Sequence, residues 1–282
     1  MSTGVVVMAY GTPASSEDIE AYYTHIRRGR PPTADQVDDL RGRYEAIGGL
    51  SPLRSITEAQ RDRLAAALGD EYRVELGFKH ASPFIEDAVA SLDDVDRVVG
   101  VVLAPHYSRG SIGEYVGRLG HRAIESWHDL REWRSFQANA VNTALRAMPE
   151  RTVVLFTAHS LPERVLENDI YPDELRASAA AIASEAGLGS EAWAIGWQSA
   201  GRTPDAWRGP DILEAIDVLD ADGLVVCPQG FTADHLEVLY DLDIAARAHA
   251  AARGIAFART AMVNDDEAVL AALAERVRSF AA

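Results

Sequence analysis

Seven runs of apolar residues, each of strand length, alternate with helical patterns along this chain. This alternation restricts the possible folds more than any other feature of the sequence. The runs cover residues 5–10, 72–78, 98–105, 152–160, 192–199, 223–230 and 255–262. Continuously apolar runs are typical of strands covered on both faces, as in a parallel sheet. The pattern therefore predicts an α/β architecture.

Capping residues and glycines mark the helices between these runs. The N-terminal signals are Ser15 or Ser16, Thr33 with Gln36, Thr57 with Gln60, and Ser82 followed by Pro83. The two Thr–Gln pairs have the spacing of a capping box, and a proline after an N-cap suits the first helical turn. Glycines that end such helices are Gly29, Gly48 and Gly69. We therefore expect helices over 15–29, 33–48 and 57–69, and one that begins at Ser82.

Two segments of the chain share one pattern, in which a buried strand runs into a short turn. The first is VVVMAYGTP, which carries Tyr10, and the second is VVLFTAHSLPE, which carries His159. We therefore expect two similar lobes, each an open sheet, over residues 1–140 and 141–255. Residues 256–282 are expected to form a last strand and a C-terminal helix that packs back on the first lobe.

Composition excludes several kinds of partner and site. The chain has 282 residues and a formal net charge of -16, which argues against nucleic acid or an anionic membrane surface as a general partner. Its single cysteine, Cys227, cannot form an intrachain disulfide or an all-cysteine iron–sulfur cluster, and we expect a buried structural thiol. The first residues lead directly into a strand, and no run is long enough to cross a bilayer. We expect a cytoplasmic protein without a membrane anchor.

Titratable side chains stand where several of the apolar runs end. His80, His106 and His159 each lie at such an end, and Tyr10 closes the first run. A histidine there is either a turn residue or, because imidazole titrates near neutral pH, a proton acceptor or metal ligand. Ligands of open α/β sheets bind beyond the carboxyl ends of the strands. We therefore expect Tyr10, His159 and the segment after Cys227 to surround one cleft.

The segment after Cys227, GFTADHLEVLYDLD, carries three carboxylates at helical spacing. Asp234, Glu237 and Asp241 are three and four residues apart, so that on an α-helix they form one stripe. Such a stripe is either a solvated face or a row of oxygen ligands. Apolar neighbours on both sides of Glu237, and a start directly after a buried strand, favour the ligand interpretation.

A basic cluster interrupts this otherwise acidic chain at HIRRGRPP. Arg27 and Arg28 are either a solvated helix end or part of an anion site, because guanidinium groups bind carboxylates and phosphates in pairs of hydrogen bonds. Arg43 and Ser51 follow on either side of a glycine-rich turn that can approach a ligand closely. No glycine pattern matches a dinucleotide-binding or P-loop fingerprint at the right place.

Together, eight segments resemble the ferrochelatase family, in the order expected of that family. They are VVVMAYGTP, YYTHIRRGRPP, RYEAIGGLSPL, GFKHASPFIEDAV, LAPHYS, TAHSLPE, GWQSAGRTPDAWRGPD and GFTADHLEVLYDLD, and they span residues 5–243. The resemblance implies the chelatase fold, with two Rossmann-like lobes, parallel sheets and a central porphyrin cleft. It also implies insertion of ferrous iron into a porphyrin, with Fe²⁺ as a substrate and without an organic cofactor.

The resemblance further implies roles for individual residues. His159, Glu237 and Tyr10 are the catalytic residues, with His159 and Glu237 flanking the metal on one face of the macrocycle and Tyr10 on the other. Asp241 extends the metal-binding set of His159 and Glu237. The substrate-binding positions are Arg27, Arg28, Arg43, Ser51 and Tyr115 near the propionates, with Lys79, His80 and Trp207 lining the cleft. Because two pyrrole protons must leave, His159 is expected to accept a proton, while Glu237 places the metal or passes protons; these roles can be exchanged or shared.

The sequence resembles the Gram-positive branch of the family, which uses coproporphyrin III, in two respects. It has a tyrosine in MAYGTP, and it lacks a long apolar segment at the mouth of the cleft. We therefore expect coproporphyrin III and Fe²⁺ as substrates, coproheme as product, and a monomeric enzyme. The alternatives are protoporphyrin IX as substrate, another metal and tetrapyrrole such as cobalt and sirohydrochlorin, a non-catalytic haem carrier, and an unrelated α/β binding protein. The sequence departs from the family at Ala245, where a third acidic residue is common, and in a shorter region before ESW.

Overall fold

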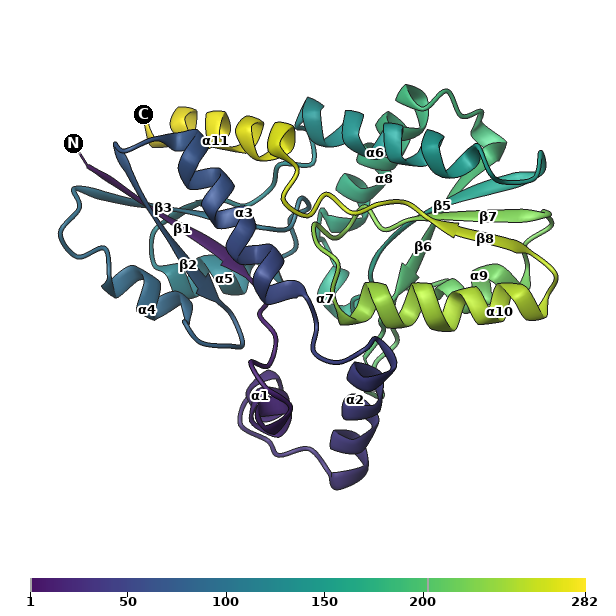
Figure 1. Cartoon of the computed structure of the whole chain (residues 1–282), viewed down its shortest axis with the longest axis horizontal. Coiled ribbons are helices and arrows are strands. Elements are labelled where there is room, and N and C mark those ends of the chain that lie inside the picture. The colour runs from purple at the N-terminus through teal and green to yellow at the C-terminus, as the bar shows by residue number, and fades with distance from the viewer. Residues whose placement is uncertain (1, 202) are drawn as a thin grey trace.

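The computed structural model describes residues 2–201 and 203–282, and these form two α/β lobes side by side (Figure 1). Each lobe is built on a four-stranded parallel sheet, with strand order β2-β1-β3-β4 in the first and β6-β5-β7-β8 in the second. The strands of the first sheet are β1 (Thr3–Ala9), β2 (Tyr72–Phe78), β3 (Arg97–Val102) and β4 (Arg122–Ile124). Those of the second are β5 (Thr152–His159), β6 (Trp193–Gln198), β7 (Gly223–Cys227) and β8 (Ala256–Arg259). The predicted fold class, with two similar parallel-sheet lobes, is confirmed.

The two sheets have the same topology, and this topology determines where a ligand can bind. In each lobe the first strand lies between the second strand on one side and the third strand on the other. The chain therefore reverses its winding direction between β1 and β3, and again between β5 and β7. Ligands of open α/β folds bind at the carboxyl ends of the strands beside such a reversal. In Figure 1 the carboxyl ends of β1 and β5 both point toward the middle of the molecule, so the two crevices face each other.

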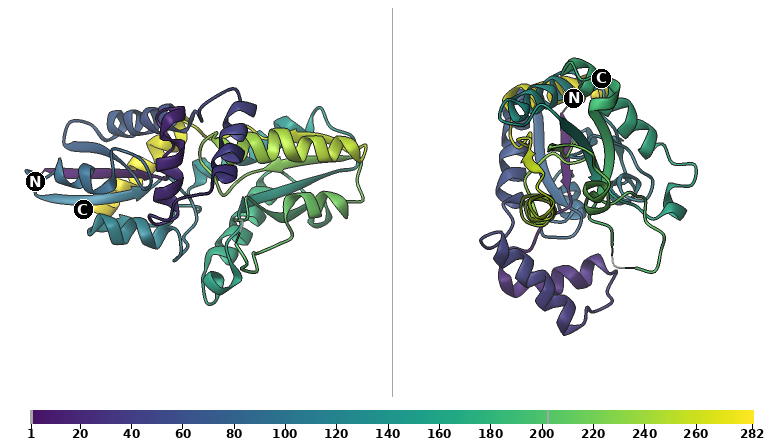
Figure 2. Two further views of the ribbon diagram at one scale, coloured as in Figure 1. Left: turned by 90° about the horizontal axis from the view of Figure 1, so that it is seen from below. Right: turned by 90° about the vertical axis from the view of Figure 1, so that its right-hand side faces the viewer.

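Helices cover both faces of each sheet, while one pair projects beside the gap between the lobes. The helices of the first half are α1 (Ile19–Ile26), α2 (Ala34–Ala46), α3 (Leu53–Leu68), α4 (Ile85–Ala90), α5 (Ile112–Leu119) and α6 (Arg131–Leu145). Those of the second half are α7 (Glu163–Leu166), α8 (Tyr171–Glu185), α9 (Ile212–Asp217), the π-helix η3 (Val238–Ala246), α10 (Arg247–Ala252) and α11 (Glu267–Ala281). Short 3-10 turns lie at Ser16–Asp18 and Ser190–Ala192. Helices α1 and α2 form the projecting pair (Figures 1 and 2).

The alternation of side chains along β1 explains how its sheet is covered on both faces. Val5 and Val7 point to one face and pack in a core shared with α3, α6, α8 and α11. Val6 and Met8 point to the other face and pack against α4 and α5. The shared core also contains Phe156 of β5, so one continuous apolar layer runs behind both lobes.

Local capping signals predicted some helix starts correctly and others wrongly. The Thr33–Gln36 capping box at the start of α2 is confirmed. The predicted start at Thr57 is wrong, because α3 already begins at Leu53 and the Thr57 hydroxyl donates to the Leu53 carbonyl inside the helix.

The helix expected to begin at Ser82 is also displaced. Helix α4 begins at Ile85, and the Asp87 carboxylate accepts the N–H of Phe84, the residue before the helix. Ser82 and Pro83 instead lie in the preceding turn, where they are joined by a cis peptide bond.

The C-terminal helix α11 lies against α3 of the first lobe, although it follows the last strand of the second. Arg278 of α11 donates to the carbonyls of Ala67 and Leu68 at the end of α3. The two chain ends consequently lie near each other at the outer end of the first lobe (Figures 1 and 2). The lobe boundaries at residues 140 and 255 stay predictions.

The lone cysteine is buried in the second sheet. Cys227 is a buried free cysteine at the end of β7, with its sulfur 3.6 Å from Oε1 of Gln137. Its position confirms the prediction that this thiol is buried, and burial raises its pKa to about 12. In the described part of the chain, no helix combines the length and the apolar character that crossing a bilayer requires.

Candidate active site

A cavity of about 1020 Å³ lies where the carboxyl ends of the two sheets face each other. Its walls come from residues that follow β1, β2, β3, β5, β6 and β7, and from α1, α2, α3 and α5. The predicted site residues on its wall are Tyr10, Arg28, Arg43, Ser51, Lys79, His80, Tyr115, His159, Trp207, Glu237 and Asp241. Arg27 is the predicted residue that does not line the cavity. Its guanidinium donates to the carbonyl of Arg30 and lies 5.7 Å from the ring centroid of Tyr23.

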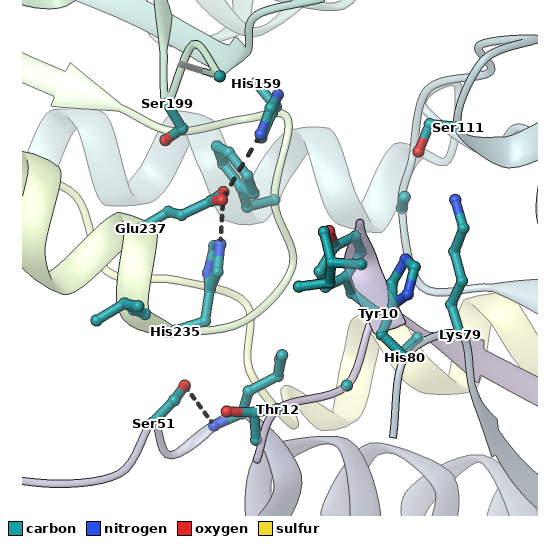
Figure 3. Close-up of a pocket in the computed structure, with 18 of the residues that line it drawn as sticks. Tyr10, Thr12, Ser51, Lys79, His80, Ser111, His159, Ser199, His235 and Glu237 are labelled. Atoms are coloured by element: carbon teal, nitrogen blue, oxygen red, sulfur yellow. Dashed lines mark hydrogen bonds and ion pairs between the residues drawn. The ribbon is translucent and has the colours of Figure 1, made fainter. Parts of the chain in front are cut away.

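On one wall, a carboxylate stands between two imidazoles (Figure 3). Nε2 of His159 lies 3.6 Å from Oε1 of Glu237, and Nε2 of His235 lies 3.6 Å from its Oε2. His159 is the last residue of β5, and Glu237 directly precedes η3. His235 was not among the predicted site residues, although its place two positions before Glu237 in the acidic segment was a usable signal. Within residues 2–201 and 203–282, no three His, Cys, Asp or Glu side chains are arranged to hold a metal ion on their own.

Backbone carbonyls fix the orientation of both imidazoles. Nδ1 of His159 lies 2.5 Å from the Ser160 carbonyl, and Nδ1 of His235 lies 3.0 Å from the Ala233 carbonyl. Because a carbonyl only accepts hydrogen bonds, Nδ1 carries the proton in each ring. The neutral ring of His159 therefore presents the lone pair of Nε2 to the cavity, where it can accept a proton or bind a metal ion.

The pKa shifts in this row reflect competition between burial and charge. Burial lowers the pKa of His159, but Glu237, the Ser160 carbonyl and Asp241 together outweigh it and raise the pKa above its ordinary value. Burial raises the pKa of Glu237, but His159 and His235 outweigh it and hold that carboxyl well below its usual range. The arrangement therefore stabilises a protonated His159 beside an ionised Glu237, a pair that can hold and then release one proton.

Asp241 lies one turn beyond Glu237 and is held by a residue that the sequence did not reveal. The Ser199 hydroxyl donates to Oδ2 of Asp241 at 2.6 Å, and Ser199 has φ of +61°, a left-handed conformation that is uncommon outside glycine. On its other side, Nη1 of Arg43 lies 3.9 Å from Oδ1 of Asp241. Burial and the nearby charge of Glu237 raise the pKa of Asp241, whereas Ser199 and Arg43 lower it. The net result is a pKa of about 6.

This pKa predicts that Asp241 lowers stability at neutral pH. Its folded-state pKa of about 6 exceeds the ordinary value of 3.8, so between those pH values the unfolded chain releases the proton first and stability falls as pH rises. The Asp241→Asn variant has no carboxyl to titrate and should not show this loss. The difference in unfolding free energy, variant minus wild type, should therefore increase by on the order of 2 kcal/mol between about pH 4 and about pH 7. Urea unfolding of both proteins across that pH range measures the difference. A constant difference would contradict the assignment.

The helix that follows Glu237 is a π-helix, whereas the sequence predicted three carboxylates on one stripe of an α-helix. Asp234 lies before the helix and is not part of that stripe. The guanidinium of Arg259, at the end of β8, binds both oxygens of Asp243 at 2.8 Å and Oδ1 of Asp234 at 3.0 Å. Asp234 and Asp243 are therefore paired behind the site, where they anchor both ends of the segment that carries Glu237 and Asp241.

The opposite wall carries Tyr10, His80 and Lys79 (Figure 3). The Tyr10 ring is open to the cavity but surrounded by protein at longer range; this desolvation, with Glu237 and Glu114, raises its pKa well above the usual value. His80 packs against Tyr10, with ring centroids 4.6 Å apart, and its Nδ1 lies 3.0 Å from Nδ1 of His25. Burial, assisted by Lys79, lowers the pKa of His80 to about 3, so His80 is neutral at physiological pH.

Cationic and hydroxyl groups surround the part of the cavity near α1, α2 and α3. The Arg43 guanidinium lies 5.1 Å from the Tyr240 ring centroid. The Ser51 hydroxyl accepts the N–H of Leu53 at the start of α3, so its own hydrogen can be donated to a ligand. Trp207 also lines the cavity, and its Nε1 donates to the Thr203 hydroxyl.

Comparisons with known proteins identify a family and relatives that match nearly the whole chain. The sequence profile of the family described as Ferrochelatase matches residues 2–281. A coproporphyrin III ferrochelatase of Geobacillus kaustophilus is 43% identical over 98% of this chain and 95% of its own length. The protein of that name from Bacillus subtilis is 42% identical over 96% of this chain and 95% of its own length.

A solved structure shows the same fold at much lower sequence identity. SirB from Bacillus subtilis with Fe³⁺ superposes with a TM-score of 0.55 and 14% identity, covering 100% of this chain and 96% of that one. The family profile and the full-length relatives agree with the resemblance that the eight ordered motifs carry. The chain belongs to the ferrochelatase family.

Proposed function

We propose that this protein inserts Fe²⁺ into coproporphyrin III and releases coproheme. The curated relatives that cover nearly the whole chain at 42–43% identity carry the name coproporphyrin III ferrochelatase. We further propose that it acts as a cytoplasmic monomer without an organic cofactor.

One observation supports this proposal more than any other, namely the chemistry of the two facing walls. His159 and Glu237 stand on one wall and Tyr10 on the other, with cationic side chains toward α1 and α5. A flat macrocycle between these walls has a proton acceptor and a carboxylate on one face. Its carboxylates would face arginine and lysine side chains, the partners that carboxylates bind most strongly.

The reaction replaces two pyrrole protons by one Fe²⁺ ion, so the site must remove two protons and deliver one metal ion. Nε2 of His159 accepts the first proton, and Glu237 stabilises the imidazolium at 3.6 Å. The second proton leaves through the same pair after the first has passed to solvent. Imidazole and carboxylate are also suitable exchangeable ligands for Fe²⁺ before the four pyrrole nitrogens take it over.

Comparison of two porphyrins tests the substrate. Under anaerobic conditions with Fe²⁺, we expect faster insertion into coproporphyrin III than into protoporphyrin IX, because two additional propionates can pair with the cationic side chains. Visible spectra follow the loss of free porphyrin and the appearance of the metallated product. Faster insertion into protoporphyrin IX would overturn the proposed substrate, and binding of either porphyrin without metallation would indicate a carrier.

A further inference from the structure

Glu114 of α5 places a carboxylate between two cations on the cavity wall. Its Oε1 accepts a hydrogen bond from Nη2 of Arg28 at 2.7 Å, and its Oε2 lies 2.6 Å from Nζ of Lys79. All three residues line the cavity. Both carboxylate oxygens therefore bind groups that would otherwise attract a negatively charged ligand.

The two cations differ in how tightly the fold holds them. The Lys79 side chain is only 8% exposed, and its Nζ lies 4.9 Å from the ring centroid of Tyr115. Burial lowers the pKa of Lys79 while Glu114 opposes that shift, so Glu114 favours the charged form of this lysine. Arg28, in contrast, is 85% exposed just after the end of α1, and an ion pair this exposed is easily exchanged.

We infer that Glu114 is a specificity-determining residue that acts as an internal substitute for a porphyrin carboxylate. Glu114 pairs with Arg28, and a propionate of the incoming porphyrin takes Arg28 over while Glu114 stays on Lys79. The inference rests on the proposed function, because it needs a porphyrin with ionised carboxylates as the ligand.

This exchange has a defined consequence for selectivity. A ligand without a carboxylate in reach of Arg28 cannot replace Glu114, and its binding leaves the Arg28–Glu114 pair intact. A ligand with such a carboxylate must compete with Glu114, so Glu114 weakens binding of acidic porphyrins in general. It thereby reserves tight binding for ligands that make several ionic contacts at once, because each further contact offsets the competition at Arg28.

Binding of metal-free coproporphyrin III, followed by porphyrin fluorescence, tests the inference independently of iron insertion. We expect Glu114→Gln to lower the Kd by about two- to fivefold at low ionic strength, the range of an exposed ion pair. High salt should reduce this gain, because it screens exposed charges. The gain should disappear in the Glu114→Gln, Arg28→Gln double variant, because Arg28 is then no longer available to the propionate.

Glu58→Gln is the matched control. Glu58 is a similarly exposed glutamate that pairs with Arg54 at 3.8 Å, and it lies outside the cavity wall. Its replacement changes the net charge equally and should leave the Kd unchanged. An unchanged or higher Kd in a Glu114→Gln protein that melts like wild type would overturn the inference.

Arg28→Gln provides a second test that does not depend on how Glu114→Gln folds. If the propionate takes over Arg28, this variant binds coproporphyrin III about two- to fivefold more weakly; if Glu114 keeps Arg28 permanently, the Kd does not change. Failure of the inference is distinct from failure of the proposed function. A wild-type protein that binds neither coproporphyrin III nor protoporphyrin IX would refute the function itself.

Discussion

His159→Ala is expected to slow iron insertion by about 10²–10⁴-fold, the range that loss of a general base usually costs. The variant removes Nε2, which faces the cavity as the group best placed to accept a pyrrole proton, while Nδ1 is held by the Ser160 carbonyl. Porphyrin binding should change little, because the cationic groups that would hold the propionates lie on other elements. Initial rates of anaerobic insertion, together with a fluorescence titration of metal-free porphyrin, separate the two effects.

His249→Ala is a suitable control for this variant. His249 lies on α10 and pairs with Asp217, and its side chain is 34% exposed, against 35% for His159. It is not among the residues that line the cavity, so its replacement should leave the insertion rate at the wild-type level. An undiminished rate in His159→Ala would exclude His159 as the base.

Glu237→Gln should reduce insertion by about 10²-fold and also change how the remaining activity depends on pH. The Glu237 carboxylate raises the pKa of His159, so removing its charge lowers that pKa. The unprotonated imidazole then forms at a lower pH. The acid limb of the rate profile should therefore move to lower pH than in the wild-type protein.

Glu237→Asp distinguishes a role of charge from a role of shape. It retains the carboxylate, so it should keep the acid limb close to its wild-type position even though the shorter side chain slows insertion. Rate profiles for the three proteins, measured between about pH 5 and about pH 9, provide the comparison. An acid limb at the same pH in wild type and Glu237→Gln would show that Glu237 does not control the titration of the base.

Much of the fold and of the site is encoded locally and was therefore predictable. The apolar runs identified seven of the eight strands in the described part of the chain, because buried parallel strands must be apolar on both faces. The exception, β4, has only three residues and begins with the charged Arg122, so it carries no such signal. Tyr10 and His159 could be assigned to one cleft, because their positions at strand ends follow from the strands themselves.

The rest depends on partners that are distant in the sequence. A carboxylate spacing of three or four residues is compatible with both an α-helix and a π-helix. The residues near Asp234 and Asp243 in the sequence do not indicate that both aspartates pair with Arg259. The left-handed φ of Ser199 likewise follows from its tertiary surroundings and not from its residue type. Glu114 has no local signal in the sequence, because its partner Arg28 lies 86 positions earlier in the chain.

The contact between α11 and α3 bears on the order in which the protein folds during synthesis. The sheet of the first lobe is complete at Ile124, but one side of its core is covered by Leu270, Leu273 and Val277. These residues leave the ribosome after the whole second lobe has been made. Until residues 270–277 have been made, this part of the first-lobe core stays uncovered, so its completion requires chain that follows the second lobe.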